Sequence, residues 1–469
     1  MAVANELVYL TLREAADGLR RRAFSAVELT EAVLARTEAV EPRVHAYITL
    51  TADQARAAAA AADGEIGAGR YRGPLHGIPI GLKDNFYTAG VRTTAGARVL
   101  ADFVPTQDAT VVTRLRAAGA VITGKLNLHE LAIGSTTTNP HYGATHNPWN
   151  LDHIPGGSSG GSGAALAAGL CFAATGTDTR GSIRNPAALC GVVGFKPTYG
   201  RVSIFGVVPL SWTMDHTGPL ARTVEDVALV MNAIAGYDPQ DATTVDVPVP
   251  DFTSGLGQPI RGLRLAVVRN WFFDALDPEV RAALETAIGV FRGLGATVED
   301  VELPSLTPTH EVFEVITRPE AAAWQHELLA ARPDDYGADV RMGLEMGELI
   351  LAIDYIRALQ LRRIMADEQY ALLRRYDGLL APTRAAPAAP IGVAATVVDS
   401  REIAIGRQGL TAPFNLSGIP AISVPCGFST AGLPIGMQVA GRPWDEVTVL
   451  RIAHAYEQAT DWHTRRPPL

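Results

Sequence analysis

Short apolar runs bounded by glycine alternate with helical segments, and this alternation constrains the fold more than any other feature of the chain. Runs of this kind lie at 78–82, Ile-Pro-Ile-Gly-Leu, and at 119–124, Gly-Ala-Val-Ile-Thr-Gly, with a helical pattern between them at 110–118. Strand texture returns at 378–381 and 421–425. Apolar runs of this length, alternating with helices, are typical of strands buried on both faces of a sheet. We therefore expect an α/β fold.

Helical patterns also occupy the N-terminal part of the chain. A capping box, Ser25 with Glu28, opens the longest of them, in which apolar residues recur at helical spacing. The patterns lie at 12–21, 25–42 and 51–62, and they end at Gly-Ala-Gly, 67–69. We expect an N-terminal helical segment over 1–69 that packs on a main domain spanning 70–469.

A long helical stretch interrupts the α/β pattern at about 307–375, where leucine, isoleucine and methionine recur every three or four residues. Because strand texture flanks it on both sides, we expect a cap-like insertion that packs over the edge of the sheet and helps to shape a substrate pocket. The longest apolar stretch, 164–174, is too short to span a bilayer and predicts a buried helix.

Composition excludes several classes of protein. The 469 residues carry a net charge of −9, which argues against a surface that attracts nucleic acid or an anionic membrane. The three cysteines, Cys171, Cys190 and Cys426, lie in apolar surroundings without the spacing of a metal site or a disulfide framework. Residues 1–19 carry charges throughout and do not resemble a signal peptide. We therefore expect a cytoplasmic protein with reduced thiols.

Three polar segments stand out as candidates for chemistry. They are 77–85, Gly-Ile-Pro-Ile-Gly-Leu-Lys-Asp-Asn; 155–163, Pro-Gly-Gly-Ser-Ser-Gly-Gly-Ser-Gly; and 178–184, Asp-Thr-Arg-Gly-Ser-Ile-Arg. A serine nucleophile needs a base and donors directed at the oxyanion. The backbone N–H groups from Thr179 to Ser182 can converge on one anion, although a plain Gly-Ser turn is the alternative interpretation. The 155–163 stretch lacks the lysine of a phosphate-binding loop.

Lys83 is the candidate base. A lysine acts as a base near neutral pH only if burial or a like charge lowers its pKa, and the apolar run before Lys83 favours burial. A salt bridge with Asp84 is the alternative, although neighbouring side chains of an extended segment point to opposite faces.

Together these segments, in this order and spacing, closely resemble the amidase signature family, and the similarity extends from about Leu75 to the C-terminus. Segments 194–203 and 415–421 resemble family sequence as well. The resemblance implies a large mixed, twisted sheet with helices on both faces. It also implies Ser182 as the nucleophile, Ser158 as a bridging serine after a cis peptide bond, and Lys83 as the base, without a metal or organic cofactor. We expect hydrolysis of carboxylic amide bonds, with aryl amides, esters and carbamates as further candidates.

One residue departs from the family pattern, because Arg180 stands where the first glycine of Asp-Thr-Gly-Gly-Ser is usual. If the position needs a positive φ, arginine is disfavoured there; otherwise its side chain leaves the pocket or adds a cation at its edge. We hypothesise that Arg180 alters substrate choice or reduces activity. Thr179, Arg180 and Gly181 are the candidate oxyanion and substrate-binding residues. Ala132 and Ile133 are candidates for an apolar substrate pocket or for plain core packing.

Other interpretations are weaker. His216 follows Asp215, but adjacent residues are poorly placed to form a Ser-His-Asp triad. His129-Glu130 is half of a zinc motif without its second histidine. We expect a small amide, ester or carbamate as the partner, no direct contact with nucleic acid or membrane, and a second copy of the chain as a candidate.

Two alternatives concern the function as a whole. The first is the glutamine-hydrolysing subunit of a tRNA-dependent amidotransferase, which needs partner subunits and an ammonia route. Members of this group carry Lys-Arg-Arg where this chain has Arg-Met-Gly at 341–343, which weakens glutamine recognition. The second is a non-catalytic binding scaffold, suggested only by Arg180.

Overall fold

The fold is described from a computed structural model, which covers residues 6–469. Over these residues, eleven strands form one twisted sheet that runs through the molecule. The order is β1-β3-β2-β6-β8-β7-β14-β15-β11-β9-β10. In chain order the strands are β1 (Tyr47–Leu50), β2 (Pro79–Lys83), β3 (Val121–Leu126), β6 (Ala173–Thr177), β7 (Val193–Lys196), β8 (Thr217–Ala221), β9 (Arg264–Val268), β10 (Thr297–Val301), β11 (Gly378–Pro382), β14 (Ala421–Phe428) and β15 (Pro434–Ala440). Two small hairpins, β4 (Thr138–Asn139) with β5 (Gly143–Ala144) and β12 (Ala395–Val398) with β13 (Arg401–Ala404), lie outside the sheet.

The sheet is mixed. β2 pairs in parallel with β3 and β6, and β9 pairs in parallel with β10 and β11. The central strands from β6 to β15 pair in antiparallel fashion. The expected α/β fold, with a large mixed sheet flanked by helices, is therefore confirmed.

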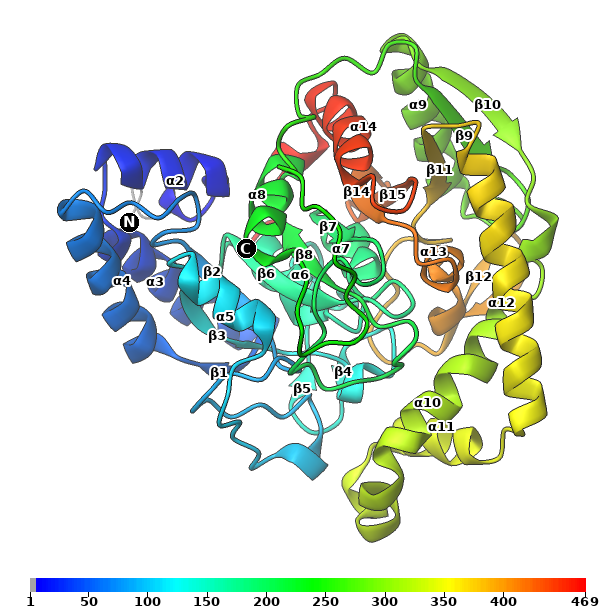
Figure 1. Ribbon diagram of the computed structural model, residues 1–469, viewed down its shortest axis with the longest axis horizontal. Coiled ribbons are helices and arrows are strands. Elements are labelled where there is room, and N and C mark those ends of the chain that lie inside the picture. The colour runs from blue at the N-terminus through cyan, green and yellow to red at the C-terminus, as the bar shows by residue number, and fades with distance from the viewer. Residues whose placement is uncertain (1–5) are drawn as a thin grey trace.

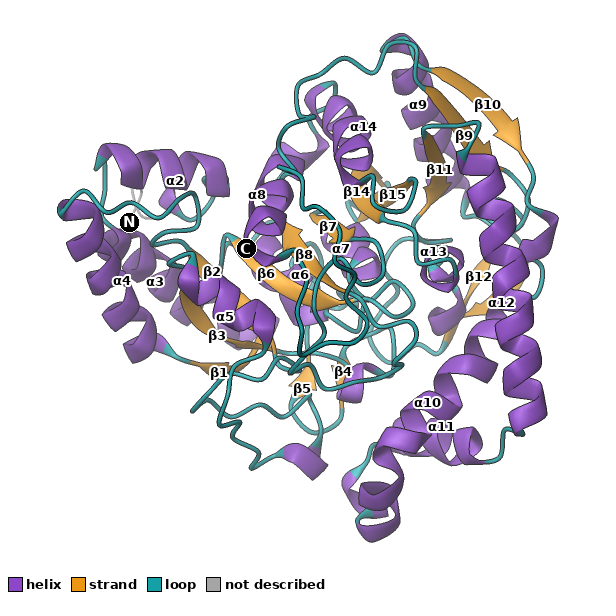
Figure 2. Ribbon diagram, in the orientation of Figure 1, coloured by secondary structure: helices purple, strands orange, loops and turns teal. Residues whose placement is uncertain are grey.

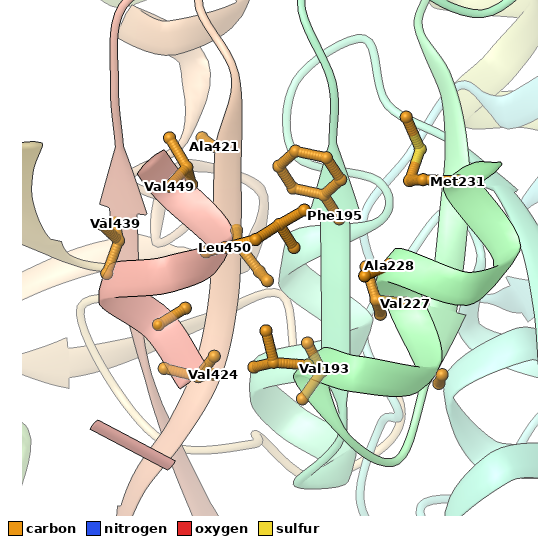
Figure 3. Close-up of a cluster of buried hydrophobic side chains, with 14 of the residues drawn as sticks. Val193, Phe195, Val227, Ala228, Met231, Ala421, Val424, Val439, Val449 and Leu450 are labelled. Carbon is orange, nitrogen blue, oxygen red and sulfur yellow. The ribbon is translucent and has the colours of Figure 1, made fainter. Parts of the chain in front are cut away.

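Helices cover both faces of the sheet (Figure 2). On one face α8 (Val224–Ile234) and α14 (Glu446–Gln458) pack against Val193 and Phe195 of β7 (Figure 3). Between these two residues, Gly194 faces α7 (Arg184–Cys190) on the opposite side, where a Cβ would lie 2.7 Å from that of Ala187. The alternation along β7 thus follows the two-residue period of a strand, and glycine allows α7 to approach closely. The other helices around the sheet are α5 (Thr110–Ala117), α6 (Gly160–Ala167), α9 (Pro278–Gly293) and α13 (Ala412–Leu416).

The N-terminal helices, drawn in blue in Figure 1, are α2 (Leu12–Arg21), α3 (Ala26–Val44) and α4 (Ala52–Gly67). The expected capping box of Ser25 and Glu28 is present. The helix continues past Pro42, where the sequence pattern predicts a break, and ends two residues later at Val44.

The helical stretch after β10 consists of α10 (Thr309–Ala331), α11 (Ala338–Glu348) and α12 (Ala352–Leu373). In Figure 1, α10 and α11 extend away from the sheet, and α12 returns toward its β9–β11 end. Across residues 6–469, no helix is long and apolar enough to cross a membrane.

The apolar stretch at 164–174 does not form one helix, contrary to expectation. α6 ends at Ala167, Gly169 has φ 77°, and Ala173 begins β6. Glycine readily adopts this left-handed conformation, which ends a helix.

Candidate active site

Lys83 is the last residue of β2, and its side chain is fully buried. Its Nζ lies 2.8 Å from Ser158 Oγ and 2.7 Å from Thr177 Oγ1. Burial lowers the pKa of Lys83 to about 7, and the charges of Asp215 and Asp178 oppose this shift. An amine with this pKa is substantially neutral at physiological pH and can accept a proton.

Asp84 does not pair with Lys83. Its carboxylate lies 3.2 Å from Lys125 Nζ and accepts hydrogen bonds from the hydroxyl and backbone N–H of Thr94. The two neighbouring side chains point to different sides, as expected for an extended segment. The salt-bridge alternative for Lys83 is therefore wrong.

The Gly157–Ser158 peptide bond is cis, which is the conformation that the family resemblance implies. Ser158 precedes α6 and is buried, and its carbonyl oxygen accepts from the N–H of His129 at 3.1 Å. The next residue, Ser159, donates its N–H to the carbonyl oxygen of Ser182 at 3.2 Å. The two serine segments are thereby joined through their backbones. Ser182 is 7 % exposed, so it lies closer to solvent than Ser158.

A buried ionic network holds the segment that carries Ser182. Arg184 donates to both oxygens of Asp178, at 3.1 and 3.0 Å, and Asn415 donates to one of them at 2.8 Å. These partners hold the pKa of Asp178 well below its usual range, against the effect of burial. Because both charges are buried and satisfied, the network is rigid, and loss of one partner is costly.

The N–H of Gly181, expected as an oxyanion donor, is already bonded within the serine loop. Its φ is 99°, and a Cβ there would lie 2.0 Å from Thr411 Oγ1, so only glycine fits. Its N–H donates to Asp178 Oδ1 at 2.6 Å. Of the expected loop donors, the N–H groups of Thr179, Arg180 and Ser182 remain as candidates.

Ser182 opens into a cavity of about 290 Å³. Thr179, Arg180, Ala132 and Ile133, four of the residues expected to bind substrate, line it as well. Ala132 has φ 61°, and Leu131 before it has φ 50°. A left-handed conformation at a residue other than glycine often accompanies a functional site, and this feature is invisible in the sequence. Helices α10 and α11 complete the cavity with Phe313, Glu314, Arg318, Met342 and Gly343, among others.

Arg180 adds a cation to the cavity wall. Its φ is not positive, since Gly181 carries the left-handed conformation instead. Its Nη1 donates to Glu314 Oε1 at 2.8 Å and its Nη2 to His310 Nδ1 at 2.7 Å. The guanidinium also stacks over Phe313, 4.8 Å from the ring centroid. The backbone strain considered for this position is therefore absent, and the side chain joins the serine loop to α10.

The two histidine alternatives find other partners. Nδ1 of His216 lies 2.6 Å from the carbonyl oxygen of Met214, while Asp215 accepts from the Thr179 hydroxyl at 2.6 Å. Nε2 of His129 lies 3.4 Å from Asp339. Within residues 6–469, no three histidine, cysteine, aspartate or glutamate residues are grouped to hold a metal ion.

Sequence reasoning missed several residues of the site. Thr177 accepts a hydrogen bond from Lys83, and Asp215, 36 residues after Thr179, accepts one from the Thr179 hydroxyl. Asn185 lines the cavity three residues after Ser182. Asn415 donates to Asp178, 237 residues away in the sequence, so no local pattern could predict this contact. The one indication in the sequence was that Asn415 lies in a segment that resembles the family.

Comparison with known proteins decides the family. The family model described as Amidase matches residues 28–450. The chain belongs to the amidase family. It is an enzyme that acts on carboxylic amide C–N bonds, as the sequence predicts.

Individual relatives cover nearly the whole chain. A glutamyl-tRNA(Gln) amidotransferase subunit from Roseiflexus sp. (strain RS-1) is 46 % identical over 98 % of both chains. Another relative is a solved chain from a vestigial protein complex, described as revealing the evolutionary origins of an s-triazine catabolic enzyme. It has a TM-score of 0.92 at 37 % identity, and the match covers 96 % of this amidase and 98 % of that chain. A bacterial aryl acylamidase of the amidase signature family has a TM-score of 0.91 at 29 % identity, with coverages of 98 % and 99 %.

Our expectation for the partners is therefore wrong. We expected a chain that acts on a small substrate by itself, with no nucleic acid and at most a second copy of the chain. This does not fit relatives that are subunits of an enzyme named for a tRNA. The net charge of −9 led to this error. Charge indicates whether the chain's own surface attracts nucleic acid. Charge does not indicate whether the enzyme that contains such a chain acts on a nucleic acid.

Proposed function

We propose that this amidase hydrolyses a carboxamide through an acyl-enzyme on Ser182, with Ser158 and Lys83 as the proton relay. The observation that carries the proposal is the contact of 2.8 Å between the buried Lys83 Nζ and Ser158 Oγ. Ser158 directly follows Gly157, which lines the same cavity as Ser182. Neutral Lys83 takes a proton from Ser158, which takes one from Ser182.

Ser182 Oγ then attacks the carbonyl carbon, and the N–H groups of Thr179, Arg180 and Ser182 are the candidate donors to the oxyanion. The protonated lysine returns the proton through Ser158 to the leaving nitrogen, the C–N bond breaks, and ammonia or an amine departs. Water attacks the acyl-enzyme by the same relay and releases the acid. No step in this sequence requires a cofactor.

A serine-directed fluorophosphonate probe tests the nucleophile. We expect labelling of the parent, and its loss in Ser182→Ala. Ser203→Ala removes another buried hydroxyl, which lies outside the cavity lining, and serves as the control. An unlabelled parent that also fails to hydrolyse any amide would contradict the proposal and favour a binding scaffold.

For the substrate, we propose glutamine, which this chain hydrolyses as one component of a tRNA-dependent amidotransferase. The amidotransferase subunit at 46 % identity supports this choice. The cavity wall also carries Arg180 and Arg318 together with Glu314 and Asp339, charges of both signs that suit an amino acid. We place the reaction in the cytoplasm, where the three free, buried cysteines would stay reduced.

Exposed apolar side chains support an assembly with other subunits. Leu349, at 79 % exposure, is the most exposed of a group along α11 and α12 that also includes Met342, Met346, Leu351, Ile353, Ile356 and Ile364. Apolar surface of this kind marks protein contacts. Glutaminase activity that appears only when the other subunits of a related amidotransferase are added would support the assembly. Equal activity without them would contradict it.

A second candidate is an apolar or aryl amide. Met342 and Gly343 stand in the cavity lining where the amidotransferase pattern has arginines, and Ile133, Phe313 and Leu344 add apolar surface. An aryl acylamidase is among the structural relatives. Release of aniline from acylanilides, compared with release of ammonia from glutamine, separates the two candidates.

A further inference from the structure

We propose that Arg180, together with Arg318, is a specificity-determining residue that binds a carboxylate carried by the amide substrate. The inference rests on the proposed function and narrows its substrate to a carboxamide that carries a carboxylate group. It starts from the position of Arg180, two residues before Ser182, in the wall of the same cavity. The side chain is 19 % exposed, so one edge of it reaches the cavity.

The two arginines on this wall share one carboxylate partner. Glu314 accepts from Arg180 with Oε1 at 2.8 Å and from Arg318 with Oε2 at 2.6 Å. One negative charge therefore serves two positive charges.

Among residues 6–469, no second carboxylate forms an ion pair with either arginine. His310 accepts from Arg180 and stays neutral at physiological pH, because burial and the neighbouring arginines lower its pKa to about 4. Asp339, which also lines the cavity, is engaged with His129 at 3.4 Å. The lining thus carries two arginines and two carboxylates, of which Glu314 is the one that pairs with the arginines.

Donors remain available on both guanidinium groups. An arginine has five N–H donors, and the two contacts of Arg180 use one on each terminal nitrogen. Among residues 6–469, its Nε has no hydrogen-bond partner. Arg318 uses Nε for Glu314 and Nη1 for Met346, which leaves Nη2 free to bind a ligand, and its side chain is 31 % exposed.

The arrangement is preorganised for an anion. Stacking on Phe313 and the bonds to α10 fix the plane of the Arg180 guanidinium. A fixed guanidinium in a partly desolvated cavity binds carboxylate strongly, because little side-chain entropy is lost on binding. Glycine at this position, the usual residue of the family pattern, offers no such group.

The test compares two amides of similar length, glutaramate, which carries a carboxylate, and hexanamide, which does not. We expect the parent to hydrolyse glutaramate with at least a tenfold higher kcat/KM. A hydrogen bond to a charged group contributes about 1.5–3 kcal/mol, or about 10- to 150-fold. Arg180→Met should therefore lower kcat/KM for glutaramate by about that factor and that for hexanamide by less than about threefold. Arg363→Met, which removes a 75 % exposed arginine on α12, is the matched control.

Binding to Ser182→Ala, measured by calorimetry, separates the inference from the chemistry. Tighter binding of glutaramate than of hexanamide supports the carboxylate site even if turnover fails. Equal binding of the two amides, or an equal loss on both substrates in Arg180→Met, would overturn it. If Arg180→Met does not fold, Arg318→Met is expected to show the same selective loss. Serine-dependent hydrolysis of both amides without a preference would refute this inference and leave the proposed function standing.

Discussion

At the scale of single residues, we expect the environment of Lys83 to set the pH dependence of the reaction. Its pKa of about 7 is lowered from the ordinary value of lysine by burial. We expect kcat/KM to rise as pH increases through about 7 and to level off above it, because only the neutral amine accepts a proton. Lys83→Ala should lower kcat/KM by about 10²–10⁴-fold. It should also abolish the rise of kcat/KM with pH near 7.

A pH–rate profile of the parent checks this prediction. Lys125→Ala changes another buried lysine, on β3 opposite Leu82 of β2, and controls for general destabilisation. A profile that is flat between pH 6 and 8, or one that Lys83→Ala leaves unchanged, would refute the role of Lys83 as the base.

Glu457 on α14 should make stability depend on pH. Burial raises its pKa to about 8, while the N–H of Val224 donates to its Oε1 at 2.9 Å. A carboxyl group with a raised folded-state pKa stabilises the fold below its unfolded pKa of about 4.3, and this stabilisation is lost as pH rises to about 8. Glu457→Gln keeps an acceptor and avoids the buried charge.

We therefore expect Glu457→Gln to be more stable than the parent at pH 9, by on the order of 5 kcal/mol at about 1.4 kcal/mol per pKa unit. At pH 4 the two should be equally stable. Urea unfolding at both pH values measures the difference. Equal stability at pH 9 would mean that Glu457 ionises in the folded state without penalty.

At the scale of elements, close approach of α7 to the sheet positions the serine loop, which leads directly into this helix. Gly194→Ala places a Cβ 2.7 Å from Ala187 and 2.9 Å from the carbonyl oxygen of Ile183. Neither neighbour can move without shifting α7. We expect a loss of about 1–3 kcal/mol and lower kcat/KM, measured by urea unfolding and amide hydrolysis.

Gly289→Ala is the matched control. This glycine lies within α9, and a Cβ there meets nothing within 4 Å. Alanine in a helix interior is expected to stabilise by about 0.5–1 kcal/mol. Destabilisation by both changes alike would argue against packing on α7 as the cause.

At the scale of the whole molecule, one apolar core crosses the boundary at residue 69. Leu12, Leu29 and Ala55 of the N-terminal helices belong to the same buried cluster as Ile80 and Leu82 of β2. We propose that residues 1–69 are a segment packed on the main domain, without independent stability, and that 307–375 form a cap-like insertion in it.

We expect a single calorimetric unfolding transition for the full chain. A chain of residues 70–469 should fail to fold, since exposing this much apolar surface exceeds a stability margin of about 5–15 kcal/mol. A well-folded 70–469 chain, or two separate transitions in the full chain, would contradict the proposed organisation.

Much of the fold was predictable because its signals are local. Apolar runs bounded by glycine indicate β2 and β3, and the Ser25 capping box marks the start of α3. The stretch at 164–174 was misjudged because its composition is equally apolar in α6 and in β6. Only the conformation of Gly169 separates the two elements, and composition does not reveal φ.

The sequence by itself determined the family, the element types and the candidate residues Lys83, Ser158 and Ser182, because each depends on a short motif. Tertiary structure alone decided how these residues act. The pKa of Lys83 depends on burial and on Asp215, far along the chain. Arg180 acquires its role from Glu314, 134 residues away. Such contacts arise only when the sheet and the helical insertion assemble, because hydrogen bonds and desolvation depend on distance in space rather than on separation in sequence.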